Sequence, residues 1–256
     1  MPVRAVDLNA DAGESFGSWR MGMDERLFPL MTSVNLACGF HAGDPTTMLA
    51  AVRHAVRMGV AVGAHPGFAD LIGFGRRDLA ASPDEVYADV LYQVGALKAM
   101  VEAAGTALHH VKPHGALYLR MTRDRQVADA VAHAVRDVDP GLPLVVLAGA
   151  GGAMMRDAAR EAGLPAVAEA FPDRAYLASG ELAPRATTGA VLHDPEVAAR
   201  RAVQMVVEGR LEAIDGAVIE LEPETLCVHG DTLESVEIAA AVRRALEEAG
   251  VEVRAF

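Results

Sequence analysis

Several short apolar runs of this chain end in residues that can act as acids, bases or ligands. Clusters of His, Asp, Glu, Lys or Gly close the runs at 6–11, 34–41, 60–65, 110–114, 166–169 and 226–231. Each run is short enough to be a buried parallel strand. The carboxyl ends of parallel strands lie on one face of a barrel or wound sheet, so residues far apart in sequence meet there. The pattern therefore predicts an active site.

The candidate catalytic residues are the carboxylates, imidazoles and lysine of these clusters. They are Asp11, Glu14, His41, His65, Lys112, His114 and Glu169. Paired carboxylates suit general acid–base work or a metal, and histidine suits the same two tasks. The 23 cationic residues include only two lysines, Lys98 and Lys112. Because a buried lysine can lose its proton and an arginine cannot, this scarcity favours a chemical role for Lys112.

The candidate substrate-binding residues lie in the same clusters and in the loops that follow them. They are Asn9, Asp44, Arg76, Arg174, Arg185, His229 and Asp231. Arginine side chains can hold an anionic substrate or a phosphate. Asp44 is equally well placed to cap the helix that starts at Pro45, and Asp231 to cap a helix at 232–249.

The residues leave a divalent metal open, because Asp11 with two of His41, His65 and His114 would make a three-ligand site. A covalent mechanism is disfavoured, since no Gly-x-Ser-x-Gly elbow occurs and Cys38 lacks an activating context. The Gly-rich turn at 148–154 matches neither a dinucleotide fingerprint nor a P-loop.

Alternating strand and helix patterns must position these residues. We predict strands at 4–9, 33–38, 60–64, 108–112, 143–148, 165–169 and 226–229, and helices at 45–58, 83–104, 123–137, 150–162, 195–208 and 232–249. Such alternation implies parallel strands with right-handed crossovers. The fold class is therefore α/β. We predict an irregular seven-stranded (β/α) TIM-like barrel that forms one catalytic domain over 1–256, with an open doubly wound sheet as the alternative. The irregular segments 11–32, 66–81 and 170–194 are predicted to be binding loops or lids.

Composition limits the class of protein. With 52% hydrophobic and 23% charged residues, the chain is globular with a large core. A net charge of −12 argues against a nucleic-acid partner. The two cysteines lie in predicted strands, the first strand starts almost at once, and no apolar run is long enough to span a bilayer. We therefore expect a cytoplasmic protein without a membrane partner.

Six segments taken together resemble the LamB/YcsF family. They are 7–17, 33–45, 63–77, 111–118, 169–185 and 227–231, and they occur in the family's order. The first departs mildly from the family pattern, with Ala10 and Ala12 in place of Cys and Leu. The resemblance implies an irregular seven-stranded β/α barrel similar to the glycoside hydrolase and carbohydrate deacetylase group.

The family is associated with one component of the prokaryotic ATP-dependent 5-oxoprolinase. The resemblance thus implies hydrolytic opening of 5-oxo-L-proline to L-glutamate, coupled to hydrolysis of ATP and carried out with two further subunits, B and C. Because no P-loop is present, we expect ATP to bind wholly or partly on those partners.

If the resemblance holds, His41, His65 and His114 would be acid–base or ligand residues. Glu169 or Asp11 would orient the water, and Lys112 and Arg174 would stabilise an oxyanion or phosphate. Two other functions remain open: a metal-dependent amide or carbohydrate deacetylase, and a non-catalytic subunit that binds a lactam.

Overall fold

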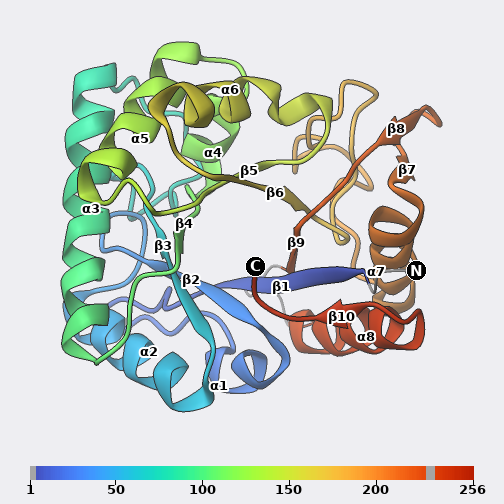
Figure 1. The fold of residues 1–256 in the computed structure, drawn as a ribbon, viewed down its shortest axis with the longest axis horizontal. Helices are drawn as coiled ribbons and strands as arrows, with labels where there is room; N and C mark the ends of the chain where they lie inside the picture. The colour runs from blue at the N-terminus through green and yellow to red at the C-terminus, as the bar shows by residue number, and fades with distance from the viewer. Residues whose placement is uncertain (1–3, 229–233) are drawn as a thin grey trace.

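Seven parallel strands close into a barrel in the computed structural model, which describes residues 4–228 and 234–256 (Figure 1). The strands in hydrogen-bonded order are β1 (Ala5–Ala12), β2 (Ser33–Ala37), β3 (Ala61–His65), β4 (His110–Val111), β5 (Leu144–Leu147), β6 (Ala166–Ala170) and β9 (Thr225–Val228). β1 also pairs with β9, with Asp7 opposite Thr225, and this pairing closes the barrel. The predicted seven-stranded TIM-like barrel is confirmed.

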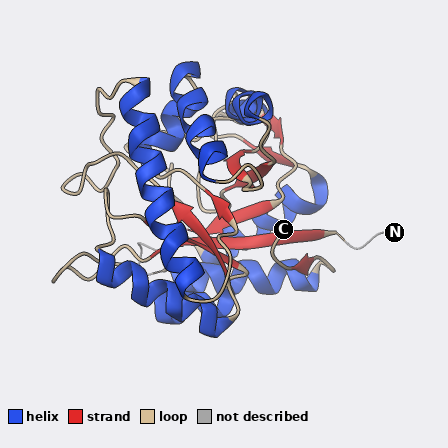
Figure 2. Ribbon diagram, turned by 60° about the vertical axis from the view of Figure 1, so that its left-hand side comes forward, coloured by secondary structure: helices blue, strands red, loops and turns tan. Residues whose placement is uncertain are grey.

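Helices surround the strands, as Figure 2 shows. The longer ones are α2 (Pro45–Met58), α3 (Pro83–Ala103), α5 (Arg125–Val138), α6 (Ala153–Ala162), α7 (Pro195–Val203) and α8 (Ser235–Glu248). Their starts follow the sequence signals. Asp44 accepts hydrogen bonds from the first turn of α2, and Ser82 forms a capping box with Glu85 at α3.

Several short elements lie outside the predicted ranges. They are α1 (Asp24–Leu27), the 3₁₀ turns η1 (Phe28–Leu30) and η2 (Ala150–Gly152), α4 (Gly115–Met121), the antiparallel pair β7 (Arg210–Glu212) and β8 (Val218–Glu220), and β10 (Glu252–Val253), which pairs with the start of β1. The helix predicted to end at residue 208 is α-helical only to Val203, and its last turn, η3 (Gln204–Glu208), is a π-helix. These elements are too short to produce a periodic pattern in the sequence.

The strand β1 shows how the barrel divides apolar from polar side chains. Val6, Leu8 and Ala10 belong to the hydrophobic core, whereas Asp7 and Asn9 are buried polar residues that bond across to other strands. Successive side chains of a strand point to opposite faces, so the odd-numbered residues enter the barrel and the even-numbered ones meet the helices. The prediction ended this strand at residue 9, because its alternating polar residues interrupt the apolar run.

Gly63 in β3 leaves room for the ring of His110 on the neighbouring strand. A Cβ atom at residue 63 would lie 2.1 Å from Nε2 of His110, whose position is fixed by a 2.7 Å contact with Asn35. We therefore expect Gly63→Ala to lower the free energy of unfolding by about 1–3 kcal/mol, as overpacked cores do.

Urea unfolding measures this effect, with Gly95→Ala as the matched control. Gly95 is exposed in the middle of α3, and a Cβ there meets nothing within 4 Å, so the same change should stabilise the chain by about 0.5–1 kcal/mol. Equal effects at the two positions would contradict the close contact with His110.

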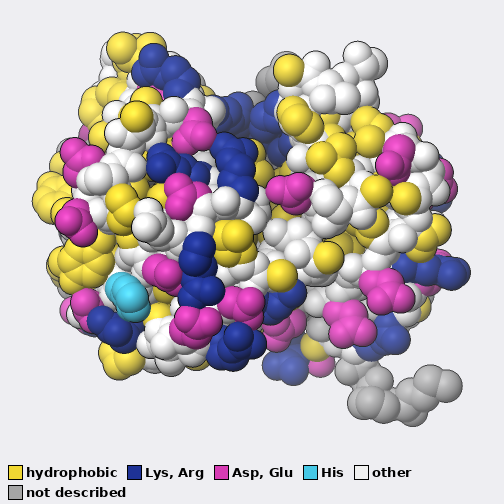
Figure 3. Space-filling view, turned by 90° about the horizontal axis from the view of Figure 1, so that it is seen from above, with side chains coloured by type: hydrophobic (Ala, Val, Ile, Leu, Met, Phe, Trp, Pro, Cys, Tyr) yellow, Lys and Arg dark blue, Asp and Glu magenta, His cyan; other side chains and the backbone are white. Residues whose placement is uncertain are grey.

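The surface mixes charges of both signs. On the face shown in Figure 3, acidic and basic side chains are interspersed, and Lys and Arg side chains gather along a hollow between two raised parts. Within 4–228 and 234–256, no helix has both the length and the apolar character needed to cross a membrane.

Candidate active site

A hydrogen-bonded network of polar side chains fills part of the barrel interior. Asn9 of β1 donates to Thr225 of β9 at 2.6 Å and to Glu169 of β6 at 3.1 Å. Asn35 of β2 donates to Oδ1 of Asn9 at 2.7 Å and to Oδ1 of Asp11 at 2.9 Å. These bonds link four strands and fix the side chains nearest the carboxyl ends.

Lys112, which directly follows β4, lies at the centre of this network. Its Nζ is 2.7 Å from Asp11 Oδ1, 3.1 Å from Glu169 Oε1 and 2.9 Å from the sulfur of Cys227. The Phe171 ring lies 5.4 Å from Nζ, within the range of a cation–π contact. Burial alone would lower the pKa of Lys112, but the nearby carboxylates outweigh it and hold that pKa well above its usual value. Lys112 is therefore a fixed buried cation.

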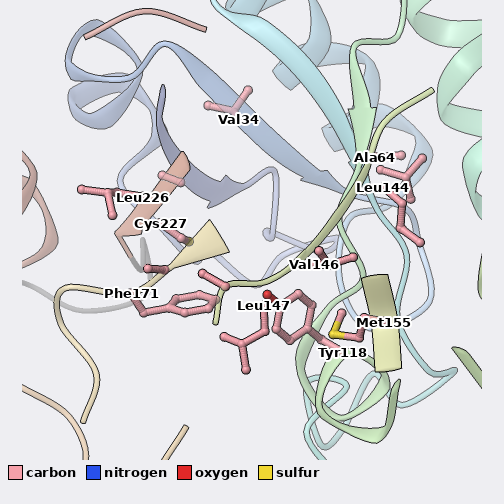
Figure 4. Packing of buried hydrophobic residues seen from close by; sticks show 14 of the residues in the cluster. Val34, Ala64, Tyr118, Leu144, Val146, Leu147, Met155, Phe171, Leu226 and Cys227 are labelled. Carbon is pink, nitrogen blue, oxygen red and sulfur yellow. The ribbon is translucent and has the colours of Figure 1, made fainter. Parts of the chain in front are cut away.

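Glu169 differs from Asp11 because one of its oxygens has no hydrogen-bond partner in the described part of the chain. Burial raises the pKa of Glu169, and Lys112 opposes that shift only in part. Oε2 of Glu169 is buried without a partner, and so is the hydroxyl of Tyr118. Tyr118 packs edge-on against Phe171 with ring centroids 6.0 Å apart, and both appear in Figure 4 beside Cys227. The unpartnered oxygens offer a donor and an acceptor to a bound molecule.

Three histidines meet beside Asp11. His65 Nε2 lies 3.2 Å from Asp11 Oδ2 and 3.0 Å from His114 Nδ1. His41 stacks on His114 with centroids 3.9 Å apart and ring planes 2° apart, and its Nε2 lies 3.9 Å from Glu14 Oε1. Burial, followed by the neighbouring histidines, lowers the pKa of His41 and of His114 well below the usual value. Both rings are therefore neutral near pH 7.

A pocket of about 370 Å³ opens over these groups. It is lined by Asp11, Glu14, His65, Arg76, Lys112, Pro113, His114, Gly115, Ala116, Tyr118, Leu119, Phe171, Arg174, Leu182, Pro184 and Arg185. Arg76 and Arg185 are exposed, whereas Arg174 is buried and donates to the carbonyls of Ala183 and Ala190. Burial and the nearby Arg185 lower the pKa of Arg174 to about 10, so it stays charged. The pocket thus combines an anion-binding side with an acid–base floor.

Most of the residues predicted from the sequence lie at this pocket. Eight of them line it: Asp11, Glu14, His65, Arg76, Lys112, His114, Arg174 and Arg185. Asn9, His41 and Glu169 lie one layer behind, in contact with those eight. His229 and Asp231 lie outside the described residues.

Asp44 is the exception, because its carboxylate is used to build the fold. It accepts hydrogen bonds from the backbone of Thr46 and Thr47 and from the hydroxyl of Thr47, and it also holds the amide of Gly17. It is not among the pocket-lining residues of the described chain. Asp44 therefore positions the loop after β1, and the structure does not bring it to a substrate.

Sequence reasoning missed the polar residues that support the site from within the barrel. They are Asp7, Asn35, His110 and Thr225, together with Tyr118 at the pocket wall. The signal was present in part, since Asp7, Asn9 and Asp11 alternate with apolar residues along β1. Alternating polar residues in a fully buried strand indicate a polar barrel interior.

Both cysteines are buried, and burial raises their thiol pKa values, to about 12 for Cys38 and well above the usual value for Cys227. We therefore expect the native protein to show no reaction with a thiol reagent such as DTNB. The same protein in denaturant should release two equivalents of the chromophore, one for each of its two cysteines. Fast titration of one thiol in the native state would contradict this assignment.

A (β/α) barrel whose strand ends gather a buried lysine, carboxylates and neutral histidines under a pocket has the architecture of a barrel enzyme. Comparison with known proteins agrees: the family model described as LamB/YcsF matches residues 6–256. The chain belongs to the LamB/YcsF family.

Relatives cover nearly the whole chain. A Thermus thermophilus protein named as the A subunit of 5-oxoprolinase is 62% identical over 98% of this chain and 99% of its own length. An Agrobacterium fabrum protein of the same name, the one numbered 1, is 51% identical over 99% of this chain and 98% of its own. The crystal structure of a lactam utilization protein, also from Thermus thermophilus, overlaps with a TM-score of 0.93 at 61% identity, covering 98% of this chain and all of that one.

Proposed function

We propose that this chain is the A subunit of an ATP-dependent 5-oxoprolinase, which opens 5-oxo-L-proline to L-glutamate. The observation that carries the proposal is the 62% identity, over 98% of the chain, to a protein of that name. The pocket supports it, because its volume of about 370 Å³ is in the range of small-molecule sites, about 300–1,000 Å³.

The charges of the site suit a lactam that has been activated. Ring opening of an unstrained lactam is uphill without coupling, and phosphorylation of the amide oxygen would convert that oxygen into a leaving group. The fixed cation of Lys112 would then stabilise the oxyanion or phosphate that develops, with Arg174 on the opposite side of the pocket. Arg76 and Arg185 are placed to hold the substrate carboxylate.

Glu169 is the best candidate to orient the attacking water. Its Oε2 has no hydrogen-bond partner among the described residues, and its raised pKa suits proton transfer. Asp11 already accepts hydrogen bonds from Lys112 and Asn35. We therefore assign Asp11 to positioning Lys112 and His65, and Glu169 to the water.

We place ATP mainly on the partner subunits B and C, and the complex in the cytoplasm. In this chain the glycines of the turn at 149–152 serve close packing. A Cβ at Gly151 would lie 2.4 Å from the carbonyl oxygen of Gly180, and one at Gly152 would lie 1.7 Å from that of Leu147. Glycines required by packing give no support to a phosphate-binding role for this turn.

The test is glutamate release from 5-oxoproline and ATP by the chain alone, by subunits B and C alone, and by all three together. Glutamate from the full set only is the expected result. Full ATP-coupled turnover by this chain alone would contradict the division of labour. No glutamate from any mixture, with the partners shown to be folded and associated, would favour the amide or carbohydrate deacetylase that the histidine cluster also suits.

A further inference from the structure

The cluster formed by His41, His65, His114 and Glu14 has a feature that acid–base chemistry alone leaves unexplained. Each residue offers one ligand atom, and these atoms all lie within 4.8 Å of one another. Ligands at 2.0–2.1 Å from a tetrahedral zinc ion are about 3.4 Å apart. The four side chains therefore need only small movements to surround one ion.

The backbone fixes which ring nitrogens carry hydrogen. His65 Nδ1 lies 2.6 Å from the carbonyl oxygen of Lys112, and His114 Nε2 lies 2.8 Å from that of Phe74. A carbonyl oxygen only accepts hydrogen bonds, so both of these nitrogens are donors. In neutral rings the other nitrogens, His65 Nε2 and His114 Nδ1, then carry lone pairs that face each other at 3.0 Å.

Two facing lone pairs repel each other unless a cation lies between or beside them. A proton is one such cation, but burial lowers the pKa of His114 well below its usual value and so disfavours it there. Histidine ligands of metals characteristically donate their second ring N–H to a backbone carbonyl or carboxylate. His65 and His114 both show this arrangement.

His41 supplies an independent observation. It is fully buried, and within residues 4–228 and 234–256 neither of its ring nitrogens has a hydrogen-bond partner. The space around it is closely fitted, because a Cβ at Gly67 would lie 2.7 Å from its Nδ1 and one at Gly75 would lie 2.8 Å from its own Cβ. An unsatisfied buried imidazole is costly, and coordination to an ion would satisfy it.

We propose that His41, His65, His114 and Glu14 bind one divalent first-row transition-metal ion, with zinc the best match. Three imidazoles and one carboxylate are ligands typical of zinc and its neighbours, whereas calcium and magnesium prefer oxygen ligands. His65, His114 and Glu14 line the pocket, so the ion would lie at its wall, where it would act as a Lewis acid.

The test is metal binding by the tag-free chain after dialysis against a chelator. We expect calorimetric titration to show one equivalent of Zn²⁺ bound, and Co²⁺ to give visible d–d absorption typical of a tetrahedral site. Loss of a partner of a metal ligand commonly costs about 10–100-fold in affinity, and loss of a ligand costs at least as much. His41→Ala and Glu14→Gln should therefore each weaken binding by at least about tenfold.

The matched control is His133→Ala, which removes an exposed histidine of α5. Zinc should raise the melting temperature of the wild-type chain and of this control, but not that of His41→Ala. Circular dichroism shows whether each variant is folded, and Glu14→Gln retains the test if His41→Ala does not fold. Absence of stoichiometric zinc, or equal binding by wild type and folded site variants, would overturn the proposal.

These measurements do not depend on glutamate release, so the two proposals fail separately. Zinc bound at this site with no glutamate from any mixture would support the metal site and refute the 5-oxoprolinase function. Glutamate from the full set, with no metal bound, would do the reverse.

Discussion

Replacing Lys112 with methionine should remove most of the glutamate release of the reconstituted complex and also destabilise the chain. The change keeps the length of the side chain but leaves Asp11 and Glu169 buried without their cation. Breaking a buried ion pair from one side costs about 3–5 kcal/mol. Loss of one group that stabilises a developing negative charge costs about 10²–10³-fold in kcat. Steady-state kinetics and urea unfolding measure the two effects.

The matched control is Lys98→Met, the same substitution at the other lysine of the chain. Lys98 pairs with Glu102 one turn further along α3, near the surface, and such pairs contribute about 0.3–0.5 kcal/mol. Activity should be unchanged. Lys112→Arg keeps the charge but presents a planar fork in place of a point charge, so we expect a folded chain with low activity. A Lys112→Met complex with nearly normal activity would show that the cation does not stabilise the reacting groups.

Glu169→Gln should separate catalysis from stability. The substitution preserves shape but removes the carboxylate assigned to the water, so we expect kcat to fall by about 10²–10⁴-fold. The raised pKa of Glu169 means that its ionised form is less favourable in the folded chain than in the unfolded one. Lys112 keeps Asp11 as its partner at 2.7 Å. The free energy of unfolding near pH 7 should therefore change by less than about 1 kcal/mol.

The pH dependence of the wild-type complex provides a second readout. Because the pKa of Glu169 lies above its ordinary 4.5, activity should fall with decreasing pH at a higher pH than an ordinary glutamate would give. This acid limb should be absent from the residual activity of Glu169→Gln. Glu212→Gln, an exposed change in β7, is the control and should leave rate and profile unaltered. A Glu169→Gln complex with an unchanged kcat would transfer the role to Asp11.

The sequence predicted the barrel because its strands and helices are long enough to show their periods. Pro45 and Pro83 with their capping residues marked helix starts, and the apolar runs before His41 and His65 marked strand ends. Short elements such as β4 and α4 carry too few residues for a period.

The composition of the site was predictable, but its layering was not. Lys112 and His65 stood out by residue type and place. Spacing alone could not show that Glu169 lies behind Lys112, or that Asp44 uses its oxygens on the start of α2. Those assignments depend on side-chain directions and on the register between strands. Register is a property of residues paired far apart, such as Asp7 with Thr225.

The pairing of β1 with β9 ties chemistry to the last stage of assembly. The hydrogen bond between Asn9 and Thr225 joins residues 216 positions apart, and Asn9 also holds Glu169. Contacts between such distant residues carry the largest loop-closure cost and form late in folding. A nascent chain therefore has no correctly placed Glu169 until its final strand has been made and inserted. The enzyme cannot act on its substrate while it is incomplete.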